Sequence, residues 1–289
     1  MGKLILVATP IGNLADVSTR QTEALQQADL VAAEDTRHSG LLLQHLGLKK
    51  PLLSYYQHNE EKRESRLLTE LAAGHTVALV SDAGTPGICD PGSAILRAAV
   101  AEGYEVDAVP GPCALIQALI LSGLPTERFA FEGFPPRAQA LLPYLQGLHQ
   151  EQRTLIFYEA PHRLQNTLQM MLQAFGPERQ IAVCRELTKK FQEINRGTLA
   201  EICALWQERQ PKGEFVLVLA GAKTEQTAAN ADPAAVQEHL ARLLAGGMKH
   251  KAAAKEVAAT YKLPVNEVYQ MGLALKINGS AKPPEAPAE

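Results

Sequence analysis

The chain has 289 residues, 46% of them hydrophobic, and a formal net charge of −3 at pH 7, which predicts more than one domain and excludes a uniformly basic surface. Its four cysteines lack CxxC spacing and histidine clusters, so we expect neither a metal site nor a disulfide framework. Because the apolar start is too short for a signal peptide and no run reaches membrane-helix length, we expect a soluble cytoplasmic protein without a membrane span.

Short apolar runs alternate with helical periodicity through residues 1–122, which we assign to an N-terminal α/β domain. Strands are expected at residues 4–8, 30–33, 52–55, 77–80 and 106–109. Helices are expected at 21–28, 41–46, 61–73, 94–102 and 113–122. Such alternation predicts βαβ units around a mostly parallel sheet.

Residues 123–221 form a second expected α/β domain, entered through the connector at 123–128. Its strands are expected at 129–131, 154–158, 181–185, 192–196 and 215–220, and its helices at 164–175 and 199–209. Because strands outnumber helices here, we expect a mixed sheet of different topology.

The remainder changes character. Residues 222–233 are polar and alanine-rich, as in a linker, and 278–289 are Pro/Ala-rich, as in a disordered tail. Between them, a helical domain at 234–277 shows periodicity at 234–244, 251–261 and 265–276. A helix-turn-helix that binds nucleic acid and a small bundle that packs on the main body are both compatible with this pattern. The basic residues are Lys249, His250, Lys251, Lys255 and Lys262.

Gly/Pro loops follow three of the expected strands of the first domain. The longest, SDAGTPGICDPG at residues 81–92, holds three glycines and two prolines; TPIGN lies at 9–13 and VPGP at 109–112. Glycine lets backbone approach a ligand closely and proline fixes the loop, and open α/β sheets bind ligands at the carboxyl ends of their strands. The three loops therefore predict one composite ligand site, although a single such loop is equally compatible with a plain turn.

A set of motifs carries a family resemblance. In chain order they are TPIGN at 9–13, AAEDTR at 32–37, HNE at 58–60, SDAGTPGICDPG at 81–92, VPGPCA at 109–114, FYEAPHR at 157–163, RELTK at 185–189 and KGEFVLV at 212–218. Together they resemble the tetrapyrrole methylase family of S-adenosyl-L-methionine-dependent methyltransferases, and within it the members that act on small-subunit ribosomal RNA. The resemblance implies a two-domain tetrapyrrole-methylase-like α/β fold with the donor cleft between domains, a small C-terminal helical domain, and a homodimer. It also implies 2′-O-methylation of a cytidine ribose in the decoding region.

The resemblance carries the donor contacts of the family to three loops and to the second domain. They are Pro10, Ser81, Asp82, Ala83, Gly84, Thr85, Pro110, Gly111, Cys113, Ala114, Tyr158 and Glu159. A donor with an aminoacyl tail, a ribose and an adenine needs carboxylate, backbone and apolar contacts together. Asp82 also suits a turn cap, Thr85 suits loop shaping without ligand contact, and Tyr158 suits a core position.

Catalysis is less defined by the sequence. Methyl transfer from a sulfonium needs mainly alignment of the reactants and removal of the hydroxyl proton. We predict Asp35, His58 and Lys189 as the catalytic group, with Asp35 and His58 as candidate bases and Lys189 as a cation near the hydroxyl or a phosphate. An ordinary salt bridge with Arg37, a surface histidine and an exposed lysine are the respective alternatives, and no metal is expected.

Two rival functions stay open. One is methylation of a small tetrapyrrole by the same fold, against which the TPIGN and SDAGTPG forms argue. The other is a non-catalytic RNA-binding factor, because residues 135–144 carry Arg137 as their only charge where relatives have a basic stretch. Phosphate contacts would then come from cations elsewhere, and binding through them should weaken steeply with salt. The candidates are Arg20, Arg37, His38, Lys62, Arg63, Arg66, Arg163, Lys189 and Lys190.

Overall fold

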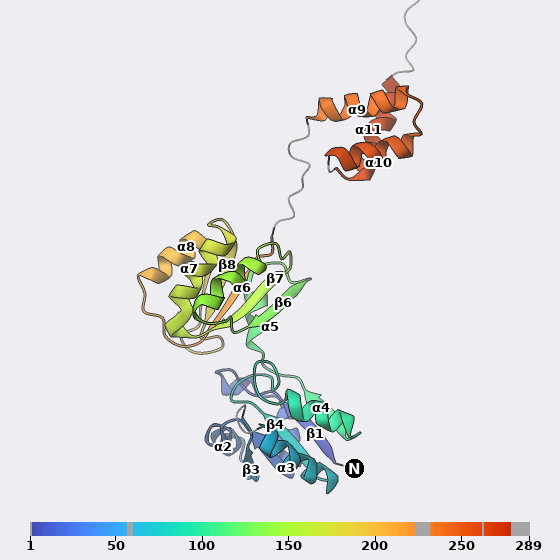
Figure 1. Cartoon of the computed structure of the whole chain (residues 1–289). Helices are drawn as coiled ribbons and strands as arrows, with labels where there is room; N and C mark the ends of the chain where they lie inside the picture. The colour runs from blue at the N-terminus through green and yellow to red at the C-terminus, as the bar shows by residue number, and fades with distance from the viewer. Residues whose placement is uncertain (1, 57–59, 223–231, 262, 279–289) are drawn as a thin grey trace, which may run out of the picture. The chain divides into compact units, whose positions relative to one another are not determined.

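A computed structural model describes residues 2–56, 60–222, 232–261 and 263–278, without the side chains of residues 60–62 and 274–278. It divides into two compact units, Met1–Ala222 and Lys223–Glu289 (Figure 1). The boundary at 122/123 within the first unit stays a prediction. The predicted linker and tail fall almost entirely on residues 223–231 and 279–289, outside the described residues. Among the helices that are described, none combines the length and apolarity that crossing a bilayer requires.

The first unit contains a parallel sheet built from its amino-terminal half. The strands β1 (Lys3–Val7), β2 (Leu30–Ala33), β3 (Leu52–Ser54), β4 (Thr76–Val80) and β5 (Glu105–Val109) lie in the order β3-β2-β4-β1-β5. Every pairing between them is parallel, which confirms the sequence prediction. The central strands are nearly continuous apolar runs because a parallel sheet is covered on both faces.

Alternate side chains of these strands enter two separate cores. Ile5 and Val7 pack with Ala24 and Leu25 of α1 (Thr19–Gln27) and with α2 (Thr36–His45). Leu4 and Leu6 pack instead with α3 (Glu60–Ala72) and α4 (Ser93–Ala101) on the opposite face. The helices therefore cover both faces, as the period of two in a strand requires. A short 3₁₀ turn, η1 (Leu14–Asp16), precedes α1.

The second sheet of this unit is mixed, as predicted. The strands β6 (Phe129–Gly133), β7 (Thr154–Glu159), β8 (Gln180–Arg185), β9 (Glu193–Thr198) and β10 (Phe215–Leu219) lie in the order β6-β7-β10-β8-β9. Among the described pairs, β6–β7 is parallel and the others are antiparallel. The short turns η2 (Ala138–Ala140) and η3 (Pro161–Arg163) precede two helices that begin at Leu141 and Leu164.

Helices cover both faces of the second sheet. The core around Phe157 and Leu217 includes α6 (Leu141–Gly147), α7 (Leu164–Phe175) and α8 (Leu199–Gln207). On the other face, α5 (Ala114–Ser122) packs against β7, β8 and β10. Because α5 follows β5 of the first sheet directly and packs on the second, it joins the two halves of the unit. The sequence did not predict α6, a short helix interrupted by a proline.

The described part of the second unit holds three helices, α9 (Pro233–Ala245), α10 (His250–Tyr261) and α11 (Val265–Asn278), at the positions that the sequence predicted. Asp232 caps α9 by accepting a hydrogen bond from the amide of Ala234. The unit has a core of its own, formed by Val236, Leu240, Ala253, Ala254, Val257, Ala258 and Val268. Three of these core residues, Ala253, Ala254 and Ala258, are alanines of α10.

Candidate donor cavity

The three Gly/Pro loops lie together, as the sequence predicted. Thr9 and Gly84 exchange backbone hydrogen bonds of 2.8 and 3.0 Å, and the Thr9 hydroxyl donates to the carbonyl of Ser81 at 3.1 Å. The Thr85 hydroxyl donates to the carbonyl of Pro112 at 3.2 Å. These bonds tie the loop after β4 to the loops after β1 and β5, so the three form one preshaped wall.

Two glycines are required by the geometry of this wall. Gly84 has φ +90°, a conformation that L side chains rarely adopt. At Gly111, a Cβ atom would lie 2.1 Å from Nε2 of Gln21, which donates to the carbonyl of Ala8 at 2.8 Å. A larger residue at 111 would therefore break the hydrogen bond that holds the end of β1.

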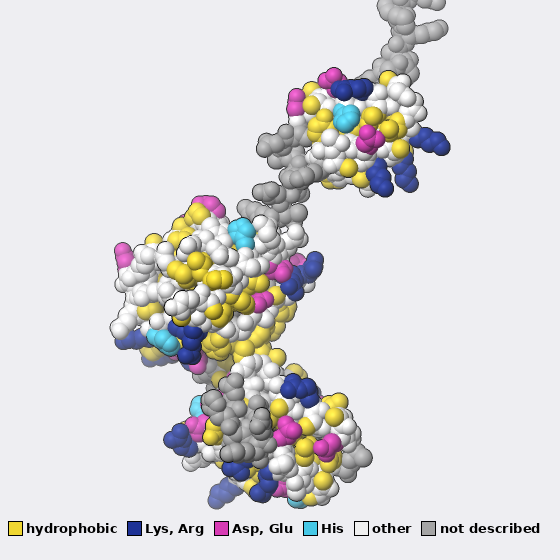
Figure 2. Space-filling model, viewed as in Figure 1, with side chains coloured by type: hydrophobic (Ala, Val, Ile, Leu, Met, Phe, Trp, Pro, Cys, Tyr) yellow, Lys and Arg dark blue, Asp and Glu magenta, His cyan; other side chains and the backbone are white. Residues whose placement is uncertain are grey.

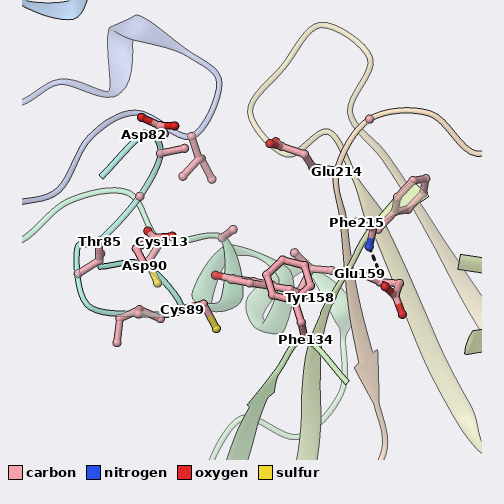
Figure 3. A pocket seen from close by; sticks show the side chains of 18 of the residues that line it. Asp82, Thr85, Cys89, Asp90, Cys113, Phe134, Tyr158, Glu159, Glu214 and Phe215 are labelled. Carbon is pink, nitrogen blue, oxygen red and sulfur yellow. Dashed lines mark hydrogen bonds between the residues drawn. The ribbon is translucent and has the colours of Figure 1, made fainter. Parts of the chain in front are cut away.

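A cavity of about 400 Å³ opens between this wall and the second sheet (Figure 3). This volume falls within the ordinary range for small-molecule sites. Figure 3 shows Asp82, Thr85 and Asp90 on one side, with Tyr158 and Glu214 opposite. The lining residues are Ile11, Glu34, Asp82, Ala83, Gly84, Thr85, Ile88, Cys89, Asp90, Cys113, Ala114, Phe134, Tyr158, Glu159, Ala160, Pro161, Gly213, Glu214, Phe215 and Val216.

The charge of the lining is uniformly negative. Glu34, Asp82, Asp90 and Glu214 face the space, and the described lining includes no lysine, arginine or histidine. Burial raises the pKa of Glu34, and burial with the nearby Glu34 and Asp82 raises that of Asp90 to about 6, against an opposing hydrogen bond from Ser81. Because like charges and burial penalise the ionised forms of Glu34 and Asp90, a cation in the cavity stabilises those forms.

The opposite wall is aromatic. Tyr158 packs edge-to-face with Phe131, at 4.9 Å between ring centroids, and with Phe134, at 5.6 Å. Burial raises the pKa of the Tyr158 phenol, so the ring stays neutral at physiological pH. Phe134 is 56% exposed although it is large and apolar. This wall offers an apolar, aromatic surface to a ring system.

Tyr158 and Glu159 are consecutive in β7 and point to opposite sides, so only Tyr158 projects into the cavity (Figure 3). The Glu159 carboxylate accepts from the Thr167 hydroxyl and from the amide of Ala160, and it forms an ion pair with Arg163 at 3.3 Å. Arg163 also donates to the carbonyls of Pro135 and Pro136. Glu159 thus holds the segment after β6 in place rather than presenting its charge to a ligand.

The structure brings most of the predicted donor contacts to this cavity. Eight residues border it: Asp82, Ala83, Gly84, Thr85, Cys113, Ala114, Tyr158 and Glu159. The other four, Pro10, Ser81, Pro110 and Gly111, belong to the loops that frame it but are not among its lining residues. Sequence reasoning missed Glu34, Asp90, Glu214 and Phe134 as lining residues. The first three lie inside the motifs AAEDTR, SDAGTPGICDPG and KGEFVLV, which was the available signal.

The structure describes two of the three residues predicted for catalysis, Asp35 and Lys189, and both form ion pairs within the chain. The Asp35 carboxylate caps α2 and pairs with Arg37; a hydrogen bond from that side chain is the main cause of its lowered pKa, which makes it a weak proton acceptor. Its amide, however, donates to Asp82 at 2.9 Å. His58 lies outside the described residues, and the roles of all three stay predictions.

Lys189 forms two ion pairs within the second half of the first unit, and its stem lies against the loop after β1. Its ammonium lies 2.7 Å from a Glu214 carboxylate oxygen and 3.0 Å from one of Glu186. Burial works to lower the pKa of this ammonium, but the two carboxylates outweigh it, so the pKa is raised and the group stays charged. Its methylene stem occupies the space where a Cβ at Gly12 would lie, 2.3 Å from the nearest carbon.

Solved methyltransferases share this fold. The uroporphyrin-III-C-methyltransferase from Thermus thermophilus matches with a TM-score of 0.56 and 22% identity, covering 76% of this chain and 94% of that one. The methyltransferase CobJ matches with a TM-score of 0.57 and 21% identity over 76% and 94% of the respective chains. The first unit therefore shares the two-sheet fold of these proteins.

The sequence comparisons are more specific. The family model for Tetrapyrrole (Corrin/Porphyrin) Methylases matches residues 3–203, and that for the RsmI C-terminal HTH domain matches 230–276. A Synechocystis protein named Ribosomal RNA small subunit methyltransferase I is 48% identical over 96% of this chain and 100% of its own length. The protein of the same name from Haemophilus influenzae is 43% identical over 94% and 97%. The chain belongs to the tetrapyrrole methylase family.

S-adenosyl-L-methionine is the methyl donor of this family, and the cavity fits it. The donor carries a sulfonium, an ammonium and one carboxylate, and so has a net positive charge. This charge matches a lining that has carboxylates and, among the described residues, no basic side chain. The wall of Phe134 and Tyr158 suits its adenine, and the volume suits a ligand of its size. When bound, the donor supplies a methyl group on a good, neutral leaving group.

Proposed function

We propose that the chain methylates the 2′-hydroxyl of a cytidine in the decoding region of small-subunit ribosomal RNA. The observation that carries this proposal is the 48% identity to a relative named for small-subunit ribosomal RNA over the whole length of that relative. The motifs that resemble this group of the family support the ribose position. The likeness to the solved methyltransferases, at 22% identity or below, concerns the fold alone.

The residues of the chain act mainly by binding and alignment. Glu34, Asp82 and Asp90 hold the cationic end of the donor, and Tyr158 with Phe134 forms the apolar wall. The backbone of Gly84 and the loop after β5 fix the direction of approach. Alignment of this kind supplies a large part of the rate of a two-substrate displacement. The hydroxyl proton leaves in the same reaction, to a carboxylate or to water.

Contacts to RNA phosphates come, in this proposal, from exposed cations outside the cavity. Figure 2 shows Lys and Arg side chains gathered on the side of the second unit where α10 lies. The exposed residues Lys249, Lys251 and Lys255 belong to this region. Arg163, a predicted phosphate ligand, is instead committed to Glu159 and two carbonyls. This basic side compensates for the near-neutral segment 135–144.

We also propose that the protein is a cytoplasmic homodimer. Ile116 and Ile120 lie one turn apart on α5 and are 39% and 64% exposed. Side chains of this kind, on a helix whose other face is buried against the second sheet, suit a subunit contact. Light scattering of the wild type and of I120E tests this part: a wild-type dimer that I120E converts to a monomer is expected, and a wild-type monomer contradicts it.

The decisive experiment is methyl transfer from labelled S-adenosyl-L-methionine to small ribosomal subunits isolated from cells that lack the protein. Nuclease digestion and mass spectrometry then map ribose methylation. A new 2′-O-methylcytidine in the decoding region is the expected result. Donor binding without incorporation into subunits or naked RNA would overturn the proposal, and a parallel assay with a tetrapyrrole acceptor would then test that alternative. Failure to bind the donor would favour a non-catalytic RNA-binding factor.

A further inference from the structure

The loop between β8 and β9 presents a phenylalanine to solvent. Phe191 is 66% exposed, one of the two largest values among the large hydrophobic side chains that the structure describes. The ammonium of the neighbouring Lys190 lies 5.7 Å from the centroid of its ring. Lys190 is exposed and forms no ion pair with any described residue. An aromatic face and a cation without a carboxylate partner thus stand side by side.

This loop is built rigidly rather than left loose. Glu186 and Thr188 adopt positive φ angles of 51° and 64°, which non-glycine residues rarely do. The amide of Lys189 donates to the carbonyl of Glu186, and the amide of Gln192 donates to that of Lys189, both at 3.1 Å. Strained backbone of this kind persists only where the surroundings fix it, and it gathers at ligand sites. The position of Phe191 is therefore held in advance of any contact.

The loop is also attached to the rim of the donor cavity. Lys189 bonds Glu214, which lines that cavity, and its stem lies against Gly12 in the loop after β1. Since consecutive Cα atoms are 3.8 Å apart, the Cα of Phe191 lies within about 8 Å of that of Lys189. A polynucleotide whose ribose reaches the donor methyl therefore has its neighbouring nucleotides within reach of the loop.

We propose that Phe191 is a stacking platform for an unpaired base of the RNA substrate and that Lys190 pairs with an adjacent phosphate. Sequence-specific RNA binding commonly stacks splayed bases on aromatic side chains beside a basic residue. This inference rests on the proposed function and names the substrate contact of that same site. The unpartnered cation beside the ring favours a nucleic acid over a second protein subunit, because a subunit contact would bury that charge.

The test compares F191L and F191W with L41A, a control at an equally exposed apolar side chain on α2, which is likewise 66% exposed. KM and kcat are measured with small subunits, donor affinity by calorimetry, and mass by light scattering. F191L is expected to raise KM for subunits about tenfold. The kcat, donor affinity and mass of F191L should match those of the wild type. F191W should keep the wild-type KM, and L41A should leave all four quantities unchanged. K190Q is expected to lower the salt slope of log KM by about one.

The outcomes separate this inference from the proposed function. An active wild type whose F191L variant keeps its KM overturns the stacking role alone. A change in mass for F191L identifies a subunit contact and also overturns it. An F191W variant whose KM rises as much as that of F191L also overturns the stacking role, because tryptophan keeps an aromatic face. A wild type that does not methylate subunits overturns the proposed function and this inference with it, and unchanged donor affinity shows that each variant is folded.

Discussion

Replacing Asp90 by asparagine should stabilise the free protein while weakening its hold on the donor. Asp90 lines the cavity, and its pKa rises from 3.8 to about 6 because burial penalises the charge and Glu34 and Asp82 add repulsion. The folded protein therefore binds the proton more tightly than the unfolded chain. The stability that Asp90 contributes is full below pH 4 and is lost as pH rises through 6.

The magnitude follows from this rise of the pKa. With about 1.36 kcal/mol for each pH unit between the folded and unfolded values, the ionised carboxylate costs at most about 3 kcal/mol at pH 7. Because the cavity is open to water on one side, we expect a smaller effect than this upper bound. D90N should raise the free energy of unfolding by about 1–2 kcal/mol at pH 7 and should leave it unchanged near pH 4. Loss of one negative charge from the lining should weaken binding of the cationic donor about tenfold.

Urea denaturation at pH 7 and pH 4, with calorimetry of donor binding at pH 7, measures both effects. Asp107 on β5 provides the matched control. Its pKa is lowered, mainly by a hydrogen bond from the amide of Ala108, so D107N should lose stability at pH 7 and leave donor affinity unchanged. The reasoning fails if D90N is no more stable than the wild type at pH 7. It also fails if the gain persists at pH 4, or if donor affinity is unaffected.

Three further perturbations test other contacts. E159Q breaks the buried pair with Arg163 and should destabilise the protein by about 3 kcal/mol in urea denaturation, with an unchanged midpoint counting against it. G12A forces the stem of Lys189 aside and should cost about 1–3 kcal/mol, measured as a lower melting temperature; unchanged melting would show that the stem moves freely. K251Q should lower the slope of log affinity for small ribosomal subunits against log salt concentration by about one. A slope equal to that of the wild type would show that Lys251 of α10 does not contact the RNA.

The sequence by itself was sufficient for the parallel sheet and the position of its loops. Strands buried on both faces must be apolar throughout, so β1 and β4 are visible as uninterrupted runs, and the Gly/Pro loops mark where they end. The mixed sheet followed from the excess of strands in residues 123–221. The motif set identified the family, since eight short motifs in a fixed order are far more specific than any one of them. The sequence did not predict α6 because a seven-residue helix with an internal proline gives little periodic signal.

The tertiary structure decided which side chains face the cavity and which are used elsewhere. Asp35 and Asp90 both lie in family motifs, yet one is paired with Arg37 while the other enters a negative cavity. Tyr158 and Glu159 are neighbours in one motif, but the pleat of β7 turns only Tyr158 toward the donor site. Local sequence determines strands and turns because these depend on nearby residues. The partner of a charge depends instead on the packing of segments far apart in the chain, as the bond between residues 35 and 82 illustrates.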